Sequence, residues 1–328
     1  MKSKSVLVAV LLSGASSMAQ TYQKAPPEVK VPDVPPKEWI EKIERLAPAQ
    51  ATAKPAGKHA VLLFSLTTGF QHYVRPYVSE IIKILAGKTG AFTVVESTDI
   101  ESFAPENLAG FDAVILNNNC PDRKHRDIFL DVLSNQVDKS IKDIGLTYKD
   151  LTEEQRKQKA AKLERYLLNY VAGGKGLVSI HGSIALQNNS APFGEMMGGS
   201  FDFHPPRQEL TLELVDPTHP LVAAFKGEGF IHSDELYLFK NDYSKTNFRP
   251  LLEANVAKLD ENSRKNPNIT QKGRLYVSWI KPYGKGRVFF VSPSHQPQSY
   301  ESERMLQFYL DGIQYALGDL HCDDSPLK

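Results

Sequence analysis

Four short apolar segments, each followed by a polar loop, constrain the fold of this chain more than any other feature. They are residues 59–65, 111–116, 177–180 and 287–291. Continuous apolar runs of this length are typical of strands that are buried on both faces of a parallel sheet. Helical patterns at residues 77–85 and 301–317 and a further strand at 92–96 accompany them. The alternation predicts an α/β protein whose parallel sheet is covered by helices on both faces.

The second half of the sequence predicts a different kind of strand pairing. Residues 209–215 alternate apolar and polar side chains, as a half-buried strand does. Further strands are predicted at residues 234–239, 250–253 and 274–280, and a Gly-containing turn joins the last of these to residues 287–291. We therefore expect antiparallel strands that extend the same sheet.

The first 58 residues contain two segments of distinct composition. Residues 1–19 combine a basic start, a short apolar stretch and small residues, which is the layout of a secretory signal peptide. An uncleaved membrane anchor is the alternative, but the stretch is too short to span a bilayer. Residues 20–58 contain seven prolines and predict an N-terminal arm, which a helix at 37–46 would fix to the main domain. We expect a secreted or periplasmic protein without a membrane span in its mature form.

Charge and motif content exclude several function classes. The 328 residues include 39 Lys and Arg against 38 Asp and Glu, so the excess of basic residues that nucleic-acid binding needs is missing. No G-x-G-x-x-G motif is present, and we expect no nucleotide cofactor. The mixed-charge stretch 121–165 is interpreted as a solvated helical face. Cys120 and Cys322 are the only two cysteines, and the sequence leaves open whether they pair.

Histidines and amides gather where the predicted parallel strands end. Ligands of α/β sheets bind at that edge, outside the carboxyl ends of the strands. The residues that follow the strands are Phe70, His72, Asn117, Asn118, His181 and His295, and the loops between them carry His204, Gln208, His232, Asp234, Glu235 and Tyr237. Neutral imidazole can bind a divalent metal or act as a base near neutral pH. No His-Glu-x-x-His signature is present, so spacing alone leaves metal binding and acid–base chemistry as open alternatives.

Residues 177–183 have the rhythm of a strand-to-helix elbow. That turn displays the nucleophile in several α/β hydrolases. Here the elbow position holds His181, and Ser183 would become the nucleophile only in a different register. The sequence thus predicts that His181 is displayed at the edge of the sheet.

Separated motifs over residues 59–317 resemble the ThuA-like (trehalose utilisation) family. They include Thr68-Gly-Phe-Gln-His72, His181-Gly182, Met197-Gly-Gly-Ser-Phe201, His204-Pro205, Asp234-Glu235-Leu-Tyr237 and His295. The resemblance implies a flavodoxin-like, class I glutamine-amidotransferase-like three-layer sandwich, with a mostly parallel central sheet and an antiparallel extension. It would occupy residues 59–320, followed by a tail at 321–328. By the same resemblance His181 stands where amidotransferases carry their nucleophilic Cys, so glutaminase activity is not expected.

The family's link to disaccharide catabolism implies a saccharide ligand. The main expectation is a secreted enzyme that acts on a sugar or 3-keto-glycoside by isomerisation, or by elimination and hydrolysis. The alternatives are a non-catalytic carbohydrate-binding protein and a metal-dependent amide or ester hydrolase. A homo-oligomer is compatible with each of them.

Each candidate residue has an expected role under the main hypothesis. The catalytic candidates are His181, His295, Asp234 and Glu235. The candidate ligands of a divalent metal, with zinc expected first, are His72, His181, His232 and His295. Asn117, Asn118 and Gln208 are expected to bind sugar hydroxyls, while Phe70, Phe203 and Tyr237 would form an apolar wall for a sugar face. His204 is placed near this site without an assigned role.

Overall fold

The computed structural model describes residues 32–134 and 148–327. The predicted signal peptide and the start of the predicted arm lie outside the described residues. Within the described ranges, no helix is long and apolar enough to cross a membrane.

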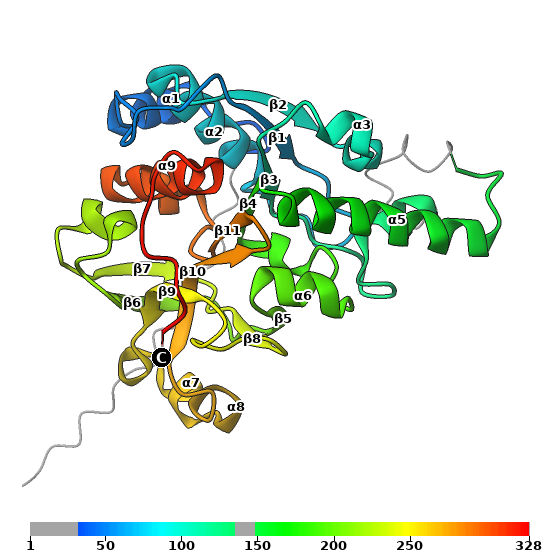
Figure 1. The fold of residues 1–328 in the computed structure, drawn as a ribbon. Coiled ribbons are helices and arrows are strands. Elements are labelled where there is room, and N and C mark those ends of the chain that lie inside the picture. The colour runs from blue at the N-terminus through cyan, green and yellow to red at the C-terminus, as the bar shows by residue number, and fades with distance from the viewer. Residues whose placement is uncertain (1–31, 135–147, 328) are drawn as a thin grey trace, which may run out of the picture. The chain divides into compact units, whose positions relative to one another are not determined.

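A nine-stranded sheet forms the centre of the fold (Figure 1). Its strands are β1 (Ala60–Phe64), β2 (Thr93–Ser97), β3 (Ala113–Asn117), β4 (Gly176–Ile180), β6 (Gln208–Leu214), β7 (Phe230–Asp234), β9 (Arg249–Ala254), β10 (Leu275–Tyr283) and β11 (Gly286–Val291). The order is β2-β1-β3-β4-β11-β10-β9-β6-β7. The first five strands pair in parallel and the others pair antiparallel, which confirms the predicted mostly parallel sheet with an antiparallel extension. The parallel part has flavodoxin-like order, which reverses direction between β1 and β3.

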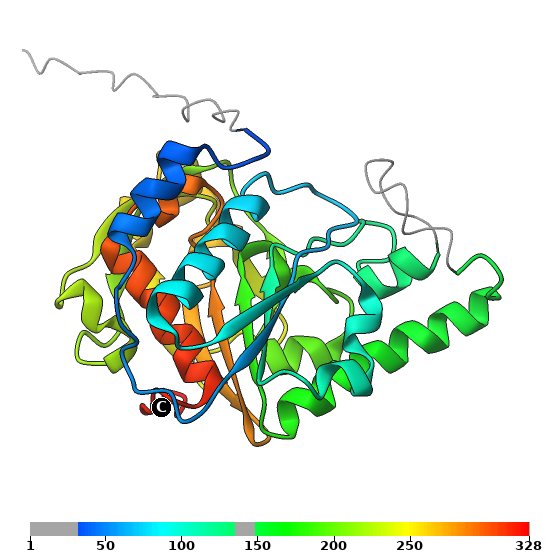
Figure 2. The same cartoon turned by 90° about the horizontal axis from the view of Figure 1, so that it is seen from above.

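Helices cover both faces of the sheet and complete the three layers (Figure 2). One face carries α2 (Arg75–Thr89) and α9 (Glu303–Leu317), and the other carries α4 (Ile128–Leu133), α5 (Glu153–Ala172) and α6 (Ala191–Met197). Alternate residues of β1 separate the two cores, because side chains along a strand point to opposite faces. Val61 and Leu63 pack toward α2 and α9, whereas Leu62 and Phe64 pack toward α5.

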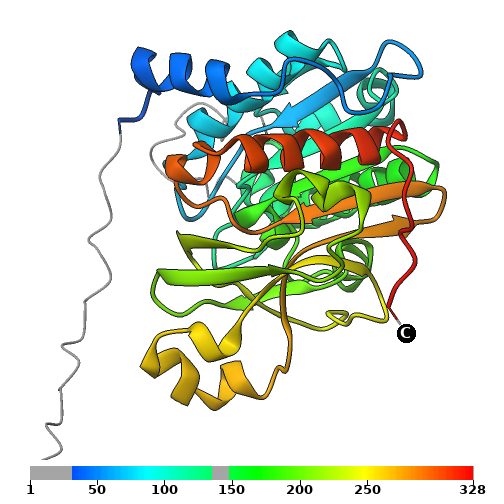
Figure 3. The ribbon, with the colours of Figure 1, turned by 90° about the vertical axis from the view of Figure 1, so that its left-hand side faces the viewer.

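Short elements complete the fold. They are α3 (Pro105–Leu108), α7 (Glu261–Lys265), α8 (Pro267–Thr270), the 3-10 turns η1 (Ile100–Phe103), η3 (His181–Ala185), η4 (Pro220–Phe225), η5 (Val256–Lys258) and η6 (Pro297–Tyr300), and a two-stranded sheet of β5 (Ser200–Phe203) and β8 (Leu238–Lys240). Figure 3 shows α7 and α8 at the end of the sheet that is opposite to β2. Cys120 and Cys322 are both free thiols.

The predicted helix at 37–46 is confirmed as α1 (Lys37–Leu46), and it packs on α2. Trp39 and Ile43 are buried in the core on this face of the sheet. The indole of Trp39 meets the ring of Tyr77 edge-on, with the ring centroids 4.7 Å apart. Its Nε1 also donates to Glu301 at 3.0 Å. This part of the proline-containing segment therefore contributes side chains to the main core.

The strand predicted at 234–239 is wrong. The chain instead ends β7 at Asp234, turns, and begins β8 at Leu238 in the small sheet. The reason is local, because the buried carboxylate of Asp234 accepts a hydrogen bond of 2.7 Å from the next backbone N–H, that of Glu235. A side chain that bonds to its own neighbouring backbone favours a turn over a ladder. The turn releases Glu235 from the sheet.

Candidate functional site

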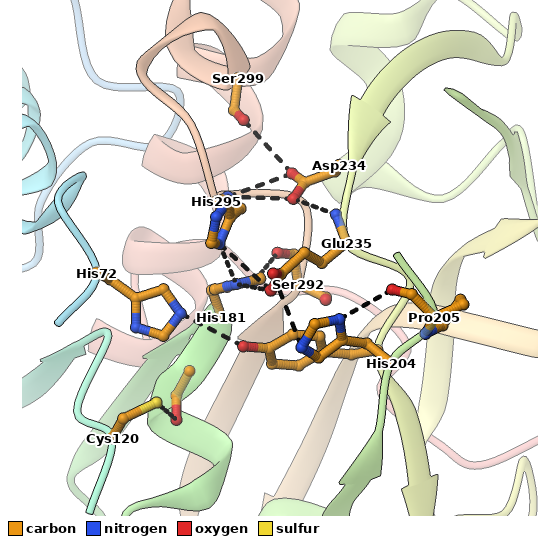
Figure 4. A network of polar contacts seen from close by, with 12 residues as sticks. His72, Cys120, His181, His204, Pro205, Asp234, Glu235, Ser292, His295 and Ser299 are labelled. Atoms are coloured by element: carbon orange, nitrogen blue, oxygen red, sulfur yellow. Dashed lines mark hydrogen bonds and ion pairs between the residues drawn. The ribbon is translucent and has the colours of Figure 1, made fainter. Parts of the chain in front are cut away.

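Four loops at the carboxyl ends of the strands bring together His72, His181, Glu235 and His295 (Figure 4). His72 follows β1, His181 follows β4, Glu235 follows β7 and His295 follows β11. One nitrogen or oxygen atom from each residue lies within 4.8 Å of the corresponding atoms of the other three. The set of three histidines and one carboxylate has the donor types that a transition metal takes.

The spacing of three of these atoms is uniform. Nε2 of His181, Nδ1 of His295 and Oε2 of Glu235 are each 3.3 Å from the other two. When ligands surround zinc tetrahedrally at about 2.0–2.1 Å, any two of them lie about 3.3 Å apart. The triangle therefore already has the edge length of a zinc-type centre. His72 supplies the fourth group, and its Nδ1 is buried without a hydrogen-bond partner.

The elbow after β4 fixes His181 in this cluster. Its Nδ1 lies 2.7 Å from the carbonyl oxygen of Ser292, and since a carbonyl only accepts, Nδ1 carries the hydrogen and Nε2 presents a lone pair. Metal-binding histidines are commonly oriented in this way by a second hydrogen bond. The backbone φ of His181 is +49°, an uncommon left-handed value for a residue with a side chain. The sequence prediction that His181 is displayed at an elbow matches this geometry.

Asp234 supports the cluster from behind. Its buried carboxylate accepts from the backbone N–H of His295 at 3.3 Å and from that of Glu235 at 2.7 Å. It also lies 2.9 Å from Nε2 of His232, which in turn lies 3.0 Å from Oγ of Ser299. Burial opposes ionisation of Asp234, but the hydrogen bond and charge of His232 lower its pKa. Asp234 thus acts on the backbone that carries two of the clustered side chains, and His232 is its partner.

Electrostatics favours the metal-binding protonation states of two groups. Burial, followed by the charges of His181 and His295, lowers the pKa of His72 well below its usual value, so the ring is neutral at neutral pH. Burial alone would raise the pKa of Glu235, but the contact with His181 and the charges of the neighbouring histidines lower it. A neutral imidazole and an ionised carboxylate are the forms that coordinate a cation.

A cavity of about 280 Å³ opens beside the cluster. Its lining comprises Phe70, His72, Cys120, Pro121, Arg123, Arg126, Ala185, Asn188, Phe201, His204, Glu235 and Tyr237. Phe70 is 57% exposed, and the Tyr237 hydroxyl lies 3.5 Å from Nε2 of His72. Nδ1 of His204 lies 2.9 Å from the Pro205 carbonyl oxygen, and its Nε2 is 3.7 Å from Oε1 of Glu235. The volume is near the lower end of ligand sites, roughly 300–1,000 Å³, and suits a small ligand.

The sequence profile of the trehalose utilisation (ThuA) family matches residues 60–316. The chain belongs to the ThuA family. This membership supports a carbohydrate-related role and agrees with the expected resemblance. No curated protein matches the sequence.

Solved structures of ThuA-like proteins share the fold. One from Bacteroides uniformis is 15% identical with a TM-score of 0.54, and the match covers 82% of this chain and 94% of that one. Another from Parabacteroides merdae is 17% identical with a TM-score of 0.50, and the match covers 81% and 92% of the two chains. At these identities the likeness confirms the glutamine-amidotransferase-like fold of this ThuA family member and nothing finer.

Four predicted sugar-binding residues of this ThuA protein lie away from the cavity. Asn117 and Asn118 are fully buried, and the Nδ2 of Asn117 donates to Ser65 and Ser79 while that of Asn118 donates to Asn117. These amide nitrogens are used inside the fold, where the Asn117 side chain joins the end of β3 to the residue after β1 and to α2.

Gln208 and Phe203 are the other two predicted sugar-binding residues, and their side chains also serve the fold. The amide of Gln208 donates to Ser263 Oγ at 2.8 Å and accepts from the N–H of Asp260 at 2.9 Å, so it holds the loop before α7. Phe203 packs against the core on the α2 and α9 face. His232, predicted as a metal ligand, is also outside the cluster, and Glu235 takes that place.

Sequence reasoning missed several cavity residues. Arg123 and Arg126 lie in a stretch interpreted as solvated surface, and Asn188 and Phe201 received no role. The position of the two arginines in the sequence could have indicated their role. Both come within ten residues of the end of β3, at the edge of the sheet where ligands bind.

Proposed function

We propose that this protein is a metal-dependent enzyme that acts on a sugar or 3-keto-glycoside, by isomerisation or by elimination and hydrolysis. The observation that carries the proposal is the equal 3.3 Å spacing of His181, His295 and Glu235 beside an aromatic-lined cavity. Family membership supports the carbohydrate part. Export, which would place the protein in the periplasm or outside the cell, belongs to the proposal on the composition of residues 1–19 alone.

The proposed metal ligands are His181, His295 and Glu235, with His72 as the fourth group and zinc as the expected ion. The donor set fits, since two histidines and a glutamate with a further position are a known zinc arrangement in enzymes. A bound divalent cation would supply Lewis-acid stabilisation of the negative charge that develops on a substrate oxygen.

His204 is the base in this proposal. Its Nδ1 bonds to a carbonyl oxygen, which leaves Nε2 as the basic nitrogen on the wall of the cavity. In a 3-keto-glycoside the carbonyl acidifies the hydrogen on C2, and Nε2 would take that proton. Proton transfer of this kind contributes about 10²–10⁴-fold to rates. Return of the proton to C3, with the C2 hydroxyl becoming the carbonyl and its proton passing to the oxygen on C3, would give isomerisation to a 2-keto sugar.

Elimination uses the same first step. The C–H electron pair forms the C1–C2 double bond, and the bond from C1 to the glycosidic oxygen breaks with its electrons on that oxygen. The imidazolium of His204 returns the proton to the departing oxygen, and addition of water across the double bond completes hydrolysis. Phe201 and Tyr237, whose ring centroids are 4.7 Å apart, give the cavity an apolar wall against which a sugar face can pack.

One experiment separates this proposal from its alternatives. Zinc-loaded protein is incubated in heavy water with a 3-keto-disaccharide, with the unmodified disaccharide and with simple amides and esters, and the products are followed by NMR. We expect deuterium at C2 and turnover of the keto sugar only. In His204→Gln both should fall at least about 100-fold with the metal retained. The exposed His321→Gln is the matched control and should behave as wild type.

The other outcomes assign the site differently. Turnover of amides or esters without C2 exchange would favour the metal-dependent hydrolase, for which the His/His/Glu donor set is also suited. Binding of sugars with no product and no exchange would favour the non-catalytic carbohydrate-binding protein. Either result would overturn the proposed proton abstraction.

A further inference from the structure

Two arginines line the cavity without a charge partner. Arg123 and Arg126 follow β3, and within residues 32–134 and 148–327 no ion pair or hydrogen bond joins either guanidinium to another side chain. Other arginines of the same chain are paired with carboxylates, namely Arg249 with Asp216 and Asp323, Arg274 with Glu253, and Arg304 with Glu228. Arg123 and Arg126 lack such a carboxylate partner, and both lie on the wall of the cavity.

The loop that carries the arginines is firmly anchored. Arg126 has a φ of +54°, a left-handed value that costs about 1–2 kcal/mol for a residue with a side chain. Its N–H donates to the Asp122 carbonyl oxygen at 2.9 Å, and its own carbonyl oxygen accepts from Asn188 at 2.9 Å. The fully buried Asp131 accepts from the N–H of Asp122 at 2.7 Å and from the Thr68 hydroxyl. These bonds hold Arg126 at the cavity wall despite the strained backbone.

The charges of the cavity lining do not balance. Among the described residues that line it, Glu235 is the only carboxylate, and that group is already joined to His181 and His295. The guanidinium groups of Arg123 and Arg126 therefore have no counter-charge in the cavity. Guanidinium recognises the oxygens of carboxylates and phosphates in a planar, two-bond geometry, and such charge-assisted bonds are about twice as strong as neutral ones.

We propose that the ligand of this cavity is an anionic saccharide, whose carboxylate or phosphate is bound by Arg123 and Arg126. The saccharide part rests on the proposed function, whereas the anionic part rests on the two unpaired guanidiniums. The proposal makes these arginines determinants of specificity, and it assigns no part in proton transfer to them.

Calorimetric titration of the zinc-loaded full chain tests the proposal with three matched ligands, glucose, glucuronate and glucose 6-phosphate. We expect at least one of the two anionic sugars to bind about 10-fold or more tightly than glucose. In the double variant Arg123→Gln/Arg126→Gln this preference should disappear while the affinity for glucose is kept. Arg264→Gln, an exposed position outside the cavity, is the control and should retain the preference. Which anionic sugar is preferred distinguishes a carboxylate from a phosphate ligand.

Either of two results would overturn the proposal. One is equal affinity for all three sugars, and the other is a preference for an anionic sugar that survives in the double variant. Failure of the proposed function gives a separate result, in which none of the sugars binds. Inorganic phosphate and acetate then decide the anionic part. Binding of either ion that is lost in the double variant supports an anion site, and the absence of such binding removes it.

Discussion

His181 and Ser292 tie the ends of two neighbouring strands together, through a hydrogen bond of 2.7 Å from Nδ1 of the histidine to the carbonyl oxygen of the serine. The two residues directly follow Ile180 and Val291, which are partners in the parallel pairing of β4 with β11. The orientation of the His181 ring is therefore a consequence of the register of the sheet. The same register places His295 three residues beyond Ser292, within reach of His181.

Asp234→Asn tests the support behind the cluster. The amide oxygen can still accept from the Glu235 N–H, but the negative charge beside His232 and the second acceptor for the His295 backbone are lost. We expect zinc affinity to fall about 10–100-fold, as is typical when a partner of metal ligands is changed. Competition with a fluorescent chelator measures this. The exposed Asp150→Asn should leave the affinity unchanged, and an unaltered affinity in Asp234→Asn would show that the carboxylate positions nothing.

Gly182 leaves room that the cluster needs. A Cβ at this position would lie 2.7 Å from Cε1 of His72 and 2.8 Å from Sγ of Cys120. Gly182→Ala should therefore displace His72, weaken zinc binding at least about 10-fold and cost about 1–3 kcal/mol of the free energy of unfolding. Gly87→Ala is the matched control, because nothing lies within 4 Å of its added Cβ in α2, and it should raise stability by about 0.5–1 kcal/mol. Equal zinc affinity in the two variants would contradict the packing described for His72.

The buried carboxyl group of Asp311 should make the stability of the protein depend on pH. This effect does not involve the histidine cluster. Burial raises the pKa of its carboxyl group to about 6, although hydrogen bonds from Thr52 and Gln307 oppose the shift. Between pH 3.8 and about 6, the carboxyl group of Asp311 is therefore protonated in the folded state and ionised in the unfolded state. Stability from this group is present at low pH and is lost as the pH rises through about 6.

Asp311→Asn removes that titration while keeping an acceptor for Thr52. Between about pH 5 and about pH 7.5, wild type should lose about 1 kcal/mol of the free energy of unfolding relative to this variant. Urea unfolding of both proteins at the two pH values measures the difference. Parallel pH profiles would mean that Asp311 has an ordinary pKa in the folded protein.

Trp39 tests whether α1 belongs to the core. The side chain is buried, meets Tyr77 edge-on and donates to Glu301. Trp39→Ala should lower the free energy of unfolding by about 3–5 kcal/mol. Val34→Ala, at a side chain that is 74% exposed, should change it by no more than about 0.5 kcal/mol. If Trp39→Ala costs as little as Val34→Ala, α1 does not pack on α2 in solution.

The strand-end rule explains which parts of the site the sequence could predict. The apolar runs before His72, His181 and His295 can be recognised without tertiary information, since only strands buried on both faces need them. The sequence alone therefore predicts three of the four clustered residues as metal ligands. It predicts Glu235 as a catalytic group, and it predicts His232 instead of Glu235 as a metal ligand. The turn that Asp234 initiates brings Glu235 into the cluster, and the sequence pattern of residues 234–239 does not reveal that turn.

Polar residues at strand ends are harder to assign because the same side chains can serve the fold. Asn117 and Asn118 occupy the expected edge, but their amide nitrogens donate to neighbours inside the protein. Buried amides need such partners, and which partner is nearest depends on packing across elements. Arg126 shows the opposite error, since the charged stretch interpreted as a solvated helical face also supplies part of the cavity wall.

The metal content of the protein tests the central claim most directly. Protein purified without chelator or affinity-tag metal should contain about one divalent ion per chain, with zinc expected first. Glu235→Gln and His181→Ala should each reduce this at least about 10-fold while circular dichroism shows a retained fold, and His321→Ala should keep the full amount. Wild-type protein that remains metal-free after incubation with zinc, manganese and nickel salts would contradict the account.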